Sequence, residues 1–240
     1  MIIRKLRIGA VVLVVILSGI SMLNLRFSYV ELSLFSGLRN SGFSHEASYQ
    51  LLTLGLAALV IALSRLLAGA GSFEYLIPSR LSGHVTPEPL VGIRAGKDDD
   101  WKALGLNFLI VISVVTAIAI YLQIINSGGF VFSIGAVLLP AILFAFVNSF
   151  TEEVIFRFSI VSVFLGNGAA ARIAALSSGL LFGAVHYWGS PGGIPGVFLA
   201  GFLGWLLAKS IAETRSLAWA WIIHFAQDVI IFTAIFGTAQ

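Results

Sequence analysis

The stretch NSFTEEVIFRFSI, residues 148–160, places Glu152, Glu153 and Arg157 in a run that is otherwise apolar or uncharged. On a helix, Glu153 and Arg157 are four residues apart and share a face, so they can pair. Glu152 is rotated by about 100° from Glu153 and lacks that partner. Charges inside a membrane-spanning helix usually face other helices or a water-filled cavity. If the chain lies in a membrane, the stretch therefore predicts a helix whose charges point into a bundle.

The composition of the chain indicates a polytopic membrane protein. Of its 240 residues, 58% are hydrophobic and only 10% are charged, and the mean hydropathy is +1.00. These values lie outside the usual range of water-soluble domains. There are no cysteines, which excludes disulfides and cysteine metal sites. We expect an all-α transmembrane helical bundle that forms a single membrane domain over residues 1–240.

Seven apolar segments have about the length, ~20 residues, that a helix needs to cross a bilayer. They cover residues 8–25, 50–70, 102–124, 130–151, 170–188, 194–212 and 216–237. We expect about seven spans, within a range of six to eight. The intervening residues 26–49 and 71–101 are predicted as solvated connections. Asp100 is predicted to cap the third span, because a carboxylate complements the start of a helix.

The basic residues predict the orientation of the chain. Arg4, Lys5 and Arg7 precede the first segment, and no small-residue cleavage site follows it. An uncleaved signal anchor with a cytoplasmic N-terminus is therefore expected. Most other basic residues then fall on cytoplasmic flanks (Arg80, Arg94, Lys97, Lys102, Arg172, Lys209 and Arg215), and two lie outside (Arg26 and Arg39). We expect a multi-pass protein of a bacterial plasma membrane.

Two later segments carry further polar residues at helical spacing. In SSGLLFGAVHYW, Phe182 and His186 are four residues apart, and in AWAWIIHFAQDVI so are His224 and Asp228. Each pair shares one helical face. A single buried histidine is commonly a structural residue, but titratable residues that cluster in neighbouring spans usually mark a functional cavity. These segments and the opening stretch therefore predict one shared site.

Spacing also predicts that two of these residues meet. Glu152 and His186 are equidistant from residue 169, and GNGA, residues 166–169, is a plausible turn between two antiparallel helices. The two side chains would then lie at matching depth. Gly179 and Gly183 share the face of His186, where small residues let a neighbouring backbone come close.

The chain resembles a known family at these positions. EEVIFR, FGAVH and HFAQD match the EExxxR, FxxxH and HxxxN/D motifs of the CAAX protease and bacteriocin-processing family, intramembrane proteases related to the Ras-converting CAAX endopeptidase. All three motifs occur in order, each within a predicted span, and they place the catalytic core at about residues 130–237. The resemblance implies the all-helical fold of a glutamate-type intramembrane protease.

The activity that the resemblance implies is hydrolysis of a peptide bond in a membrane-associated or lipidated peptide or protein. Glu152 would activate water, His186 would polarise it, and His224 would help to stabilise the oxyanion. Asp228 would lie beside the scissile carbonyl. Where relatives have asparagine an amide can donate, whereas an ionised aspartate only accepts, so Asp228 is expected to orient His224 or to act as a protonated donor. The supporting residues would be Glu153, Arg157 and Phe182.

The metal dependence of such a site stays open at this point. The favoured glutamate-type mechanism requires no cofactor, and the HExxH spacing of many zinc proteases is absent. Two histidines and one glutamate nevertheless form the ligand set of a catalytic zinc. If zinc binds, Glu152, His186 and His224 are the expected ligands.

Two other functions fit the same motifs. One is a non-catalytic membrane scaffold or self-immunity protein, and the other is a proton-coupled transporter, which would usually show paired repeats that this chain lacks. The expected partners are membrane lipid and a peptide or protein substrate, and no nucleic acid. The sequence leaves open whether the substrate is a prenylated CaaX protein, a bacteriocin leader or a surface-protein anchor. It also leaves open to which face of the membrane the site opens.

Overall fold

The computed structural model describes residues 1–37, 41–94, 96, 99–123, 129–189 and 192–238. Arg39 and Lys97 lie outside these residues. The described chain is helical apart from loops and two isolated antiparallel bridges, His84 with Asp100 and Glu88 with Ile93. The helices are α1 (Ile2–Phe27), α2 (Ser41–Ala68), α3 (Phe73–Leu76), α4 (Trp101–Gln123), α5 (Leu139–Glu153), α6 (Ser159–Gly166), α7 (Ala171–Val185), α8 (Gly193–Thr214) and α9 (Ala218–Thr238). The expected all-α fold is confirmed.

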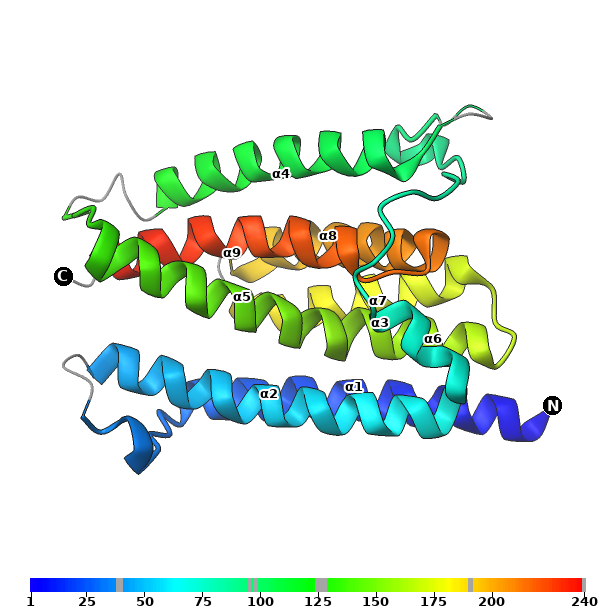
Figure 1. Cartoon of the computed structure of the whole chain (residues 1–240), viewed down its shortest axis with the longest axis horizontal. Coiled ribbons are helices and arrows are strands. Elements are labelled where there is room, and N and C mark those ends of the chain that lie inside the picture. The colour runs from blue at the N-terminus through cyan, green and yellow to red at the C-terminus, as the bar shows by residue number, and fades with distance from the viewer. Residues whose placement is uncertain (38–40, 95, 97–98, 124–128, 190–191, 239–240) are drawn as a thin grey trace.

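The long helices run side by side along the long axis of the molecule (Figure 1). Among the described residues, six helical stretches are long and apolar enough to cross a membrane. The chain is thus an integral membrane protein with a span count inside the expected range. The predicted segment 170–188 forms α7, whose 15 residues are too few for such a stretch. It is followed by a short 3-10 turn, His186–Trp188.

The fourth predicted span is longer than the sequence indicated. A wide π-helical turn, Val154–Phe158, joins α5 to α6, and a second one, Ile134–Leu138, precedes α5. Together they form one rod of 33 residues, Ile134–Gly166. The predicted segment stopped at residue 151 because the charged residues interrupt the apolar run. The helix continues past them because Glu153 and Arg157 are completely buried inside the bundle.

The prediction that residues 26–49 form a solvated connection is wrong over its second half. Helix α2 begins at Ser41, and both His45 and Glu46 are buried. The His45 ring stacks on Tyr29 with centroids 4.6 Å apart, and Glu46 pairs with Arg26 at 2.5 Å. Polarity indicated solvent here, but these side chains meet one another within the protein.

Several local predictions are confirmed. The Asp100 carboxylate accepts a hydrogen bond of 2.7 Å from the backbone N–H of Lys102, at the start of α4. The chain turns back directly after α6, and Gly168 in this turn has a φ of +78°, which favours glycine. At Gly183, an added Cβ would lie 2.6 Å from the Val197 carbonyl oxygen of α8, so α7 and α8 are in backbone contact. The small residues thus permit the predicted close approach.

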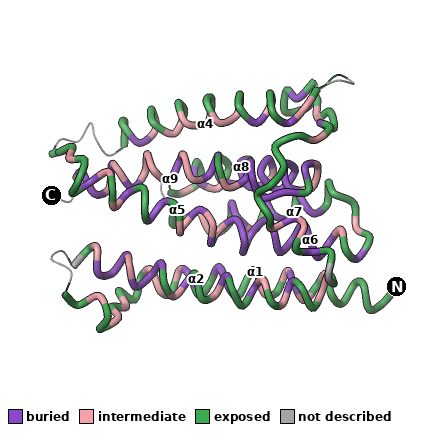
Figure 2. The backbone as a smooth tube through the Cα atoms, in the orientation of Figure 1, coloured by how far each residue is buried: buried purple, intermediate pink, exposed green. Residues whose placement is uncertain are grey.

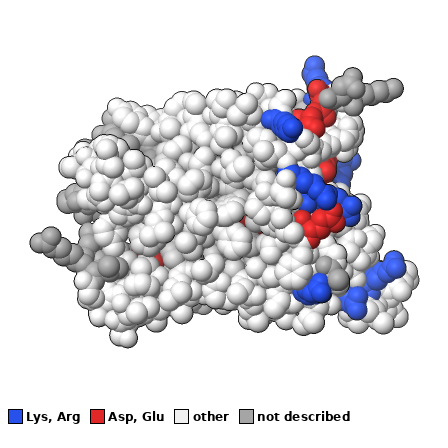
Figure 3. Space-filling view, in the orientation of Figure 1, with Lys and Arg blue, Asp and Glu red and all other residues white. Residues whose placement is uncertain are grey.

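Burial and charge are distributed as expected for a bundle in lipid. Buried residues concentrate on α6 and on the inner faces of the neighbouring helices, whereas α4 is mostly exposed (Figure 2). In the view of Figure 3, lysine and arginine gather at the end of the molecule that holds the N-terminus, and the long apolar flank is almost free of charge. The carboxylates of Glu152 and Glu153 are therefore not part of the charged surface at that end.

Candidate active site

A cavity of about 570 Å³ is lined by residues of α1, α2, α4, α5, α7, α8 and α9. Its wall is mostly apolar, but four of the side chains that the motifs predict as catalytic line it, namely Glu152, His186, His224 and Asp228. Phe182 lines it too, whereas Glu153 and Arg157 lie behind the wall. The fold thus brings together residues from α5, α7 and α9, together with the turn after α7.

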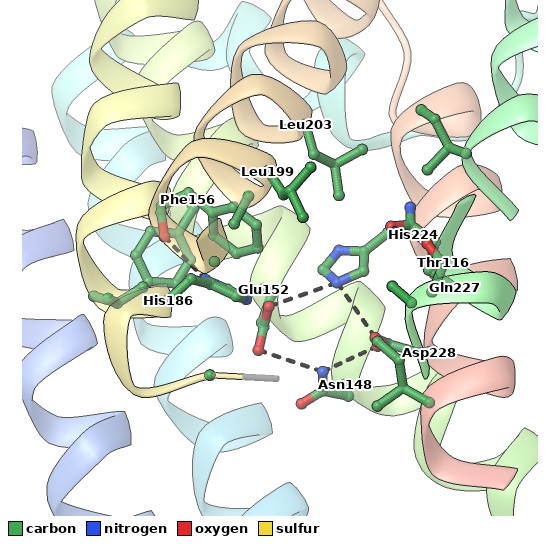
Figure 4. A pocket seen from close by; sticks show the side chains of 18 of the residues that line it. Thr116, Asn148, Glu152, Phe156, His186, Leu199, Leu203, His224, Gln227 and Asp228 are labelled. Carbon is green, nitrogen blue, oxygen red and sulfur yellow. Dashed lines mark hydrogen bonds and ion pairs between the residues drawn. The ribbon is translucent and has the colours of Figure 1, made fainter. Parts of the chain in front are cut away.

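Glu152 occupies the centre of this group. Figure 4 shows its carboxylate between the imidazoles of His186 and His224. Its Oε2 atom lies 3.6 Å from Nε2 of His224, and its side chain is 13% exposed. The carboxylate lines the cavity and lies close to an imidazole nitrogen. A carboxylate in such a position has the chemistry of a general base.

His224 is held between carboxylates on both sides of its ring. Its Nδ1 atom lies 2.7 Å from Oε1 of Glu153, and its Nε2 atom lies 3.5 Å from Oδ1 of Asp228. The sequence suggested Asp228 as the residue that orients His224, but the shorter contact comes from Glu153. Since a carboxylate only accepts, Nδ1 of His224 donates to Glu153. In a protonated ring the Nδ1–H donates to Glu153, whereas the Nε2–H lies near Glu152 and Asp228 without a short hydrogen bond.

Glu153 and Arg157 form the predicted ion pair. Nη1 of Arg157 lies 3.3 Å from Oε1 of Glu153, and both side chains are fully buried. The guanidinium also covers the ring of Phe182, with Cζ 3.4 Å from the ring centroid. The cation thus balances a carboxylate that also contacts His224. Glu153 therefore links the arginine to the cavity wall.

His186 is oriented by its own helix. Its Nδ1 atom lies 2.9 Å from the carbonyl oxygen of Phe182, and the rings of these residues are 4.0 Å apart. Because a carbonyl oxygen only accepts, the Nδ1 atom carries the proton. The Nε2 atom of the neutral ring is then a lone-pair acceptor. The main-chain carbonyl of Phe182, one helical turn earlier, thus fixes this tautomer.

A row of polar residues at the site was not predicted from the sequence. Arg26 lines the cavity and pairs with Glu46, whose other oxygen accepts from Nε2 of Gln50 at 2.8 Å. The same Gln50 nitrogen donates to Oδ1 of Asn148 at 3.3 Å, and Asn148 also lines the cavity. The four-residue spacing of Glu46 and Gln50 was a usable signal. It was missed because residues 26–49 were predicted to be a loop.

The zinc alternative requires three ligands that converge on one point. Among the described residues, no group of three histidine, aspartate or glutamate side chains is arranged to hold a metal ion. Nδ1 of His186 and Nδ1 of His224 are both engaged with oxygen acceptors. These contacts leave Nε2 of each ring available, as it would be in a metal-binding histidine, and the zinc alternative stays a prediction.

Comparison with known proteins bears on the same region. Residues 134–230 match the family model described as Rce1-like, "Type II CAAX prenyl endopeptidase Rce1-like". The match covers less than half of the chain but contains all three motifs. Neither the curated proteins nor the solved structures give a match. The family resemblance read from the motifs is confirmed over residues 134–230, where this membrane protein is similar to the Rce1-like CAAX-type proteases.

Proposed function

We propose that the protein is a glutamate-type intramembrane endopeptidase. The observation that supports this most strongly is the Glu152 carboxylate between two imidazoles, in the wall of a cavity of about 570 Å³ among apolar helices. An apolar cavity shields the reacting groups from bulk water and strengthens their electrostatic interactions. A scaffold protein would have no use for a base, a water-orienting acceptor and a donor in one place.

In the proposed reaction, a water molecule lies between Glu152 and Nε2 of His186. Nε2 accepts a hydrogen bond from one O–H of the water. Glu152 removes the other proton as the water oxygen attacks the carbonyl carbon of the substrate. The carbonyl becomes an oxyanion. The C–N bond then breaks, and the proton on Glu152 passes to the leaving nitrogen. The products are a carboxylic acid and an amine.

The oxyanion needs a donor, and His224 is positioned to supply one. With Nδ1 bonded to Glu153, the protonated ring presents its Nε2–H to the cavity. The nearest carboxylate oxygens to Nε2 are 3.5 and 3.6 Å away, so this N–H is not committed to a short hydrogen bond. Arg157 supports the arrangement through Glu153. No step of this mechanism passes through a metal ion.

The proposed substrate is a membrane-associated or lipidated peptide or protein, and a prenylated CaaX peptide fits the family best. The apolar part of the cavity wall suits a lipid chain. It includes Phe108, Val111, Ile112 and Val115 of α4, and Leu199 and Leu203 of α8. The polar motif side chains in the lining come from α5, α9 and the turn after α7, and the peptide bond would lie beside them.

We also propose a cytoplasmic N-terminus in a bacterial plasma membrane. Basic residues gather at the N-terminal end of the bundle, in line with the excess of positive charge on cytoplasmic flanks. The cavity lies toward the other end, because its wall includes Arg26 near the end of α1 and Gly196 near the start of α8. In this orientation the reaction would occur in the outer half of the membrane.

The test is cleavage of a farnesylated CaaX peptide that carries a fluorophore and a quencher on either side of the scissile bond. Glu152→Gln and His186→Ala should each lower the rate by roughly 100-fold or more, because general acid–base catalysis contributes 10²–10⁴-fold. Thr151→Val is the matched control, since the Thr151 hydroxyl lies beside Glu152 in sequence, is buried and bonds to nothing in the described residues. Wild-type rates in either site variant would refute the proposed mechanism. A scaffold protein would keep its cellular phenotype in Glu152→Gln, which preserves size.

A further inference from the structure

Asn148 lies one helical turn before Glu152 and contacts two carboxylates of the site. Its Nδ2 atom donates to Oε1 of Glu152 at 3.3 Å and to Oδ2 of Asp228 at 3.0 Å. The two interactions appear as dashed lines in Figure 4, where Asn148 lies below the carboxylates. An amide nitrogen has two hydrogens, so one can go to each carboxylate. Asn148 thus bridges α5 and α9 at the cavity wall.

The direction of this amide is determined by its neighbours on α2. Glu46 only accepts, so Gln50 must present Nε2 to it, at 2.8 Å. The same nitrogen lies 3.3 Å from Asn148, which must therefore present its oxygen to Gln50 and its nitrogen to the carboxylates. Arg26 balances the charge of Glu46 from α1. A row of hydrogen bonds from α1 and α2 thereby holds the amide in one orientation.

The site needs such a donor because position 228 is aspartate. Glu152 and Asp228 both lie near Nε2 of His224, at 3.6 and 3.5 Å, and neither ionised carboxylate can donate to the other. Two ionised carboxylates so placed repel each other, and an amide that donates to both lowers that repulsion. Asparagine at 228, which the motif also allows, would bring an amide from α9. In this chain Asn148 brings it from α5.

We propose that Asn148 is a positioning residue of the active site, which clamps Glu152 beside Asp228 and supplies the carboxamide that position 228 lacks. This inference rests on the proposed function, since it assigns Asn148 to the same reaction. With Oε1 bonded to Asn148, Glu152 presents Oε2 toward His224 and the cavity. Asn148 therefore selects which oxygen of the general base meets the water.

The first experiment measures kcat and KM with the farnesylated peptide. Asn148→Ala removes the amide, and Asn148→Asp keeps the shape but removes the donor. Each should lower kcat by roughly 10- to 100-fold, as expected for loss of a hydrogen bond to a charged group, with little change in KM. Thr151→Val on the same helix again serves as the matched control.

The decisive variants restore an amide from the other helix. In the Asn148→Ala background, Asp228→Asn should recover at least roughly tenfold in kcat, because the new amide can turn toward Glu152 and one negative charge is gone. Asp228→Ala in the same background removes that charge but supplies no donor, and it should recover nothing. A merely structural role of Asn148 would give no such difference between the two double variants.

An unfolding measurement tests the clamp without reference to activity. Denaturant midpoints of Asn148→Ala, Asp228→Ala and the double variant should be non-additive, with the double variant less destabilised than the two losses together. Additive midpoints would overturn the clamp. The positioning role would be overturned by an unchanged kcat in both single variants at position 148. It would also be overturned by equal rates in the two double variants. If wild-type protein cleaves nothing, the proposed function fails, while the unfolding cycle still decides whether Asn148 couples to Asp228.

Discussion

The contact between α7 and α8 makes Gly183→Ala a sensitive perturbation. An alanine Cβ at 183 would lie 2.6 Å from the Val197 carbonyl oxygen and 3.0 Å from Cα of Gly201, whereas ordinary contacts begin at 3.4 Å. Both neighbours are backbone atoms of α8, so no flexible side chain can give way. The two helices must separate by about 0.8 Å, the difference between the required and the available distance to the oxygen.

The separation should affect both stability and activity. Overpacking of this kind costs about 1–3 kcal/mol of the free energy of unfolding. Gly183 lies three residues before His186, so α7 carries the displacement into the site, where a shift near 1 Å can lower a rate roughly 100-fold. We expect a lower unfolding midpoint in detergent, followed by tryptophan fluorescence, and slower cleavage of the farnesylated peptide.

Gly201→Ala is the matched control for this prediction. It adds the same methyl group at the same interface, but its nearest neighbours would be the Gly179 carbonyl oxygen at 3.4 Å and Cα of Gly183 at 3.8 Å, which are ordinary contacts. It should unfold and cleave as the wild type does. If both alanine variants behave alike, or if Gly183→Ala matches the wild type, the close approach of these helices does not hold the site.

Two further predictions concern the buried ion pair and the orientation. Arg157→Leu should destabilise the protein by about 3–5 kcal/mol in denaturant unfolding, because Glu153 stays buried without its arginine partner. Glu153→Gln/Arg157→Leu should recover part of the loss, and equal stability of Arg157→Leu and wild type would contradict this. The chain has no cysteine, so Ser28→Cys, directly after α1, and Ser79→Cys, in the loop after α3, can be labelled singly at exposed positions. With a cytoplasmic N-terminus, an impermeant maleimide should label only position 28 in intact cells, and labelling of position 79 alone would reverse the orientation.

The sequence could predict whatever depends on composition and on helical spacing within one segment. The mean hydropathy indicated membrane helices, and the four-residue spacings indicated that Glu153 pairs with Arg157 and that Phe182 shares a face with His186. The same reasoning showed that Gly183 lies on the face that meets another helix. The paired residues are neighbours on one helix. Gly183 is a small residue on the face that also carries His186.

Tertiary structure alone decided which faces meet across the bundle. The contact of His224 with Glu153 and the contact of Asn148 with Gln50 join residues 71 and 98 positions apart in the chain. The π-helical turn at Val154–Phe158 also changes the rotation of the rod beyond Glu153, which no apolar pattern signalled. Periodicity determines which residues share a face of one helix, but packing, tilt and rotation determine which partner that face contacts. Hence the motif residues could be identified from the sequence, whereas the row from Arg26 to Asn148 that supports them could not.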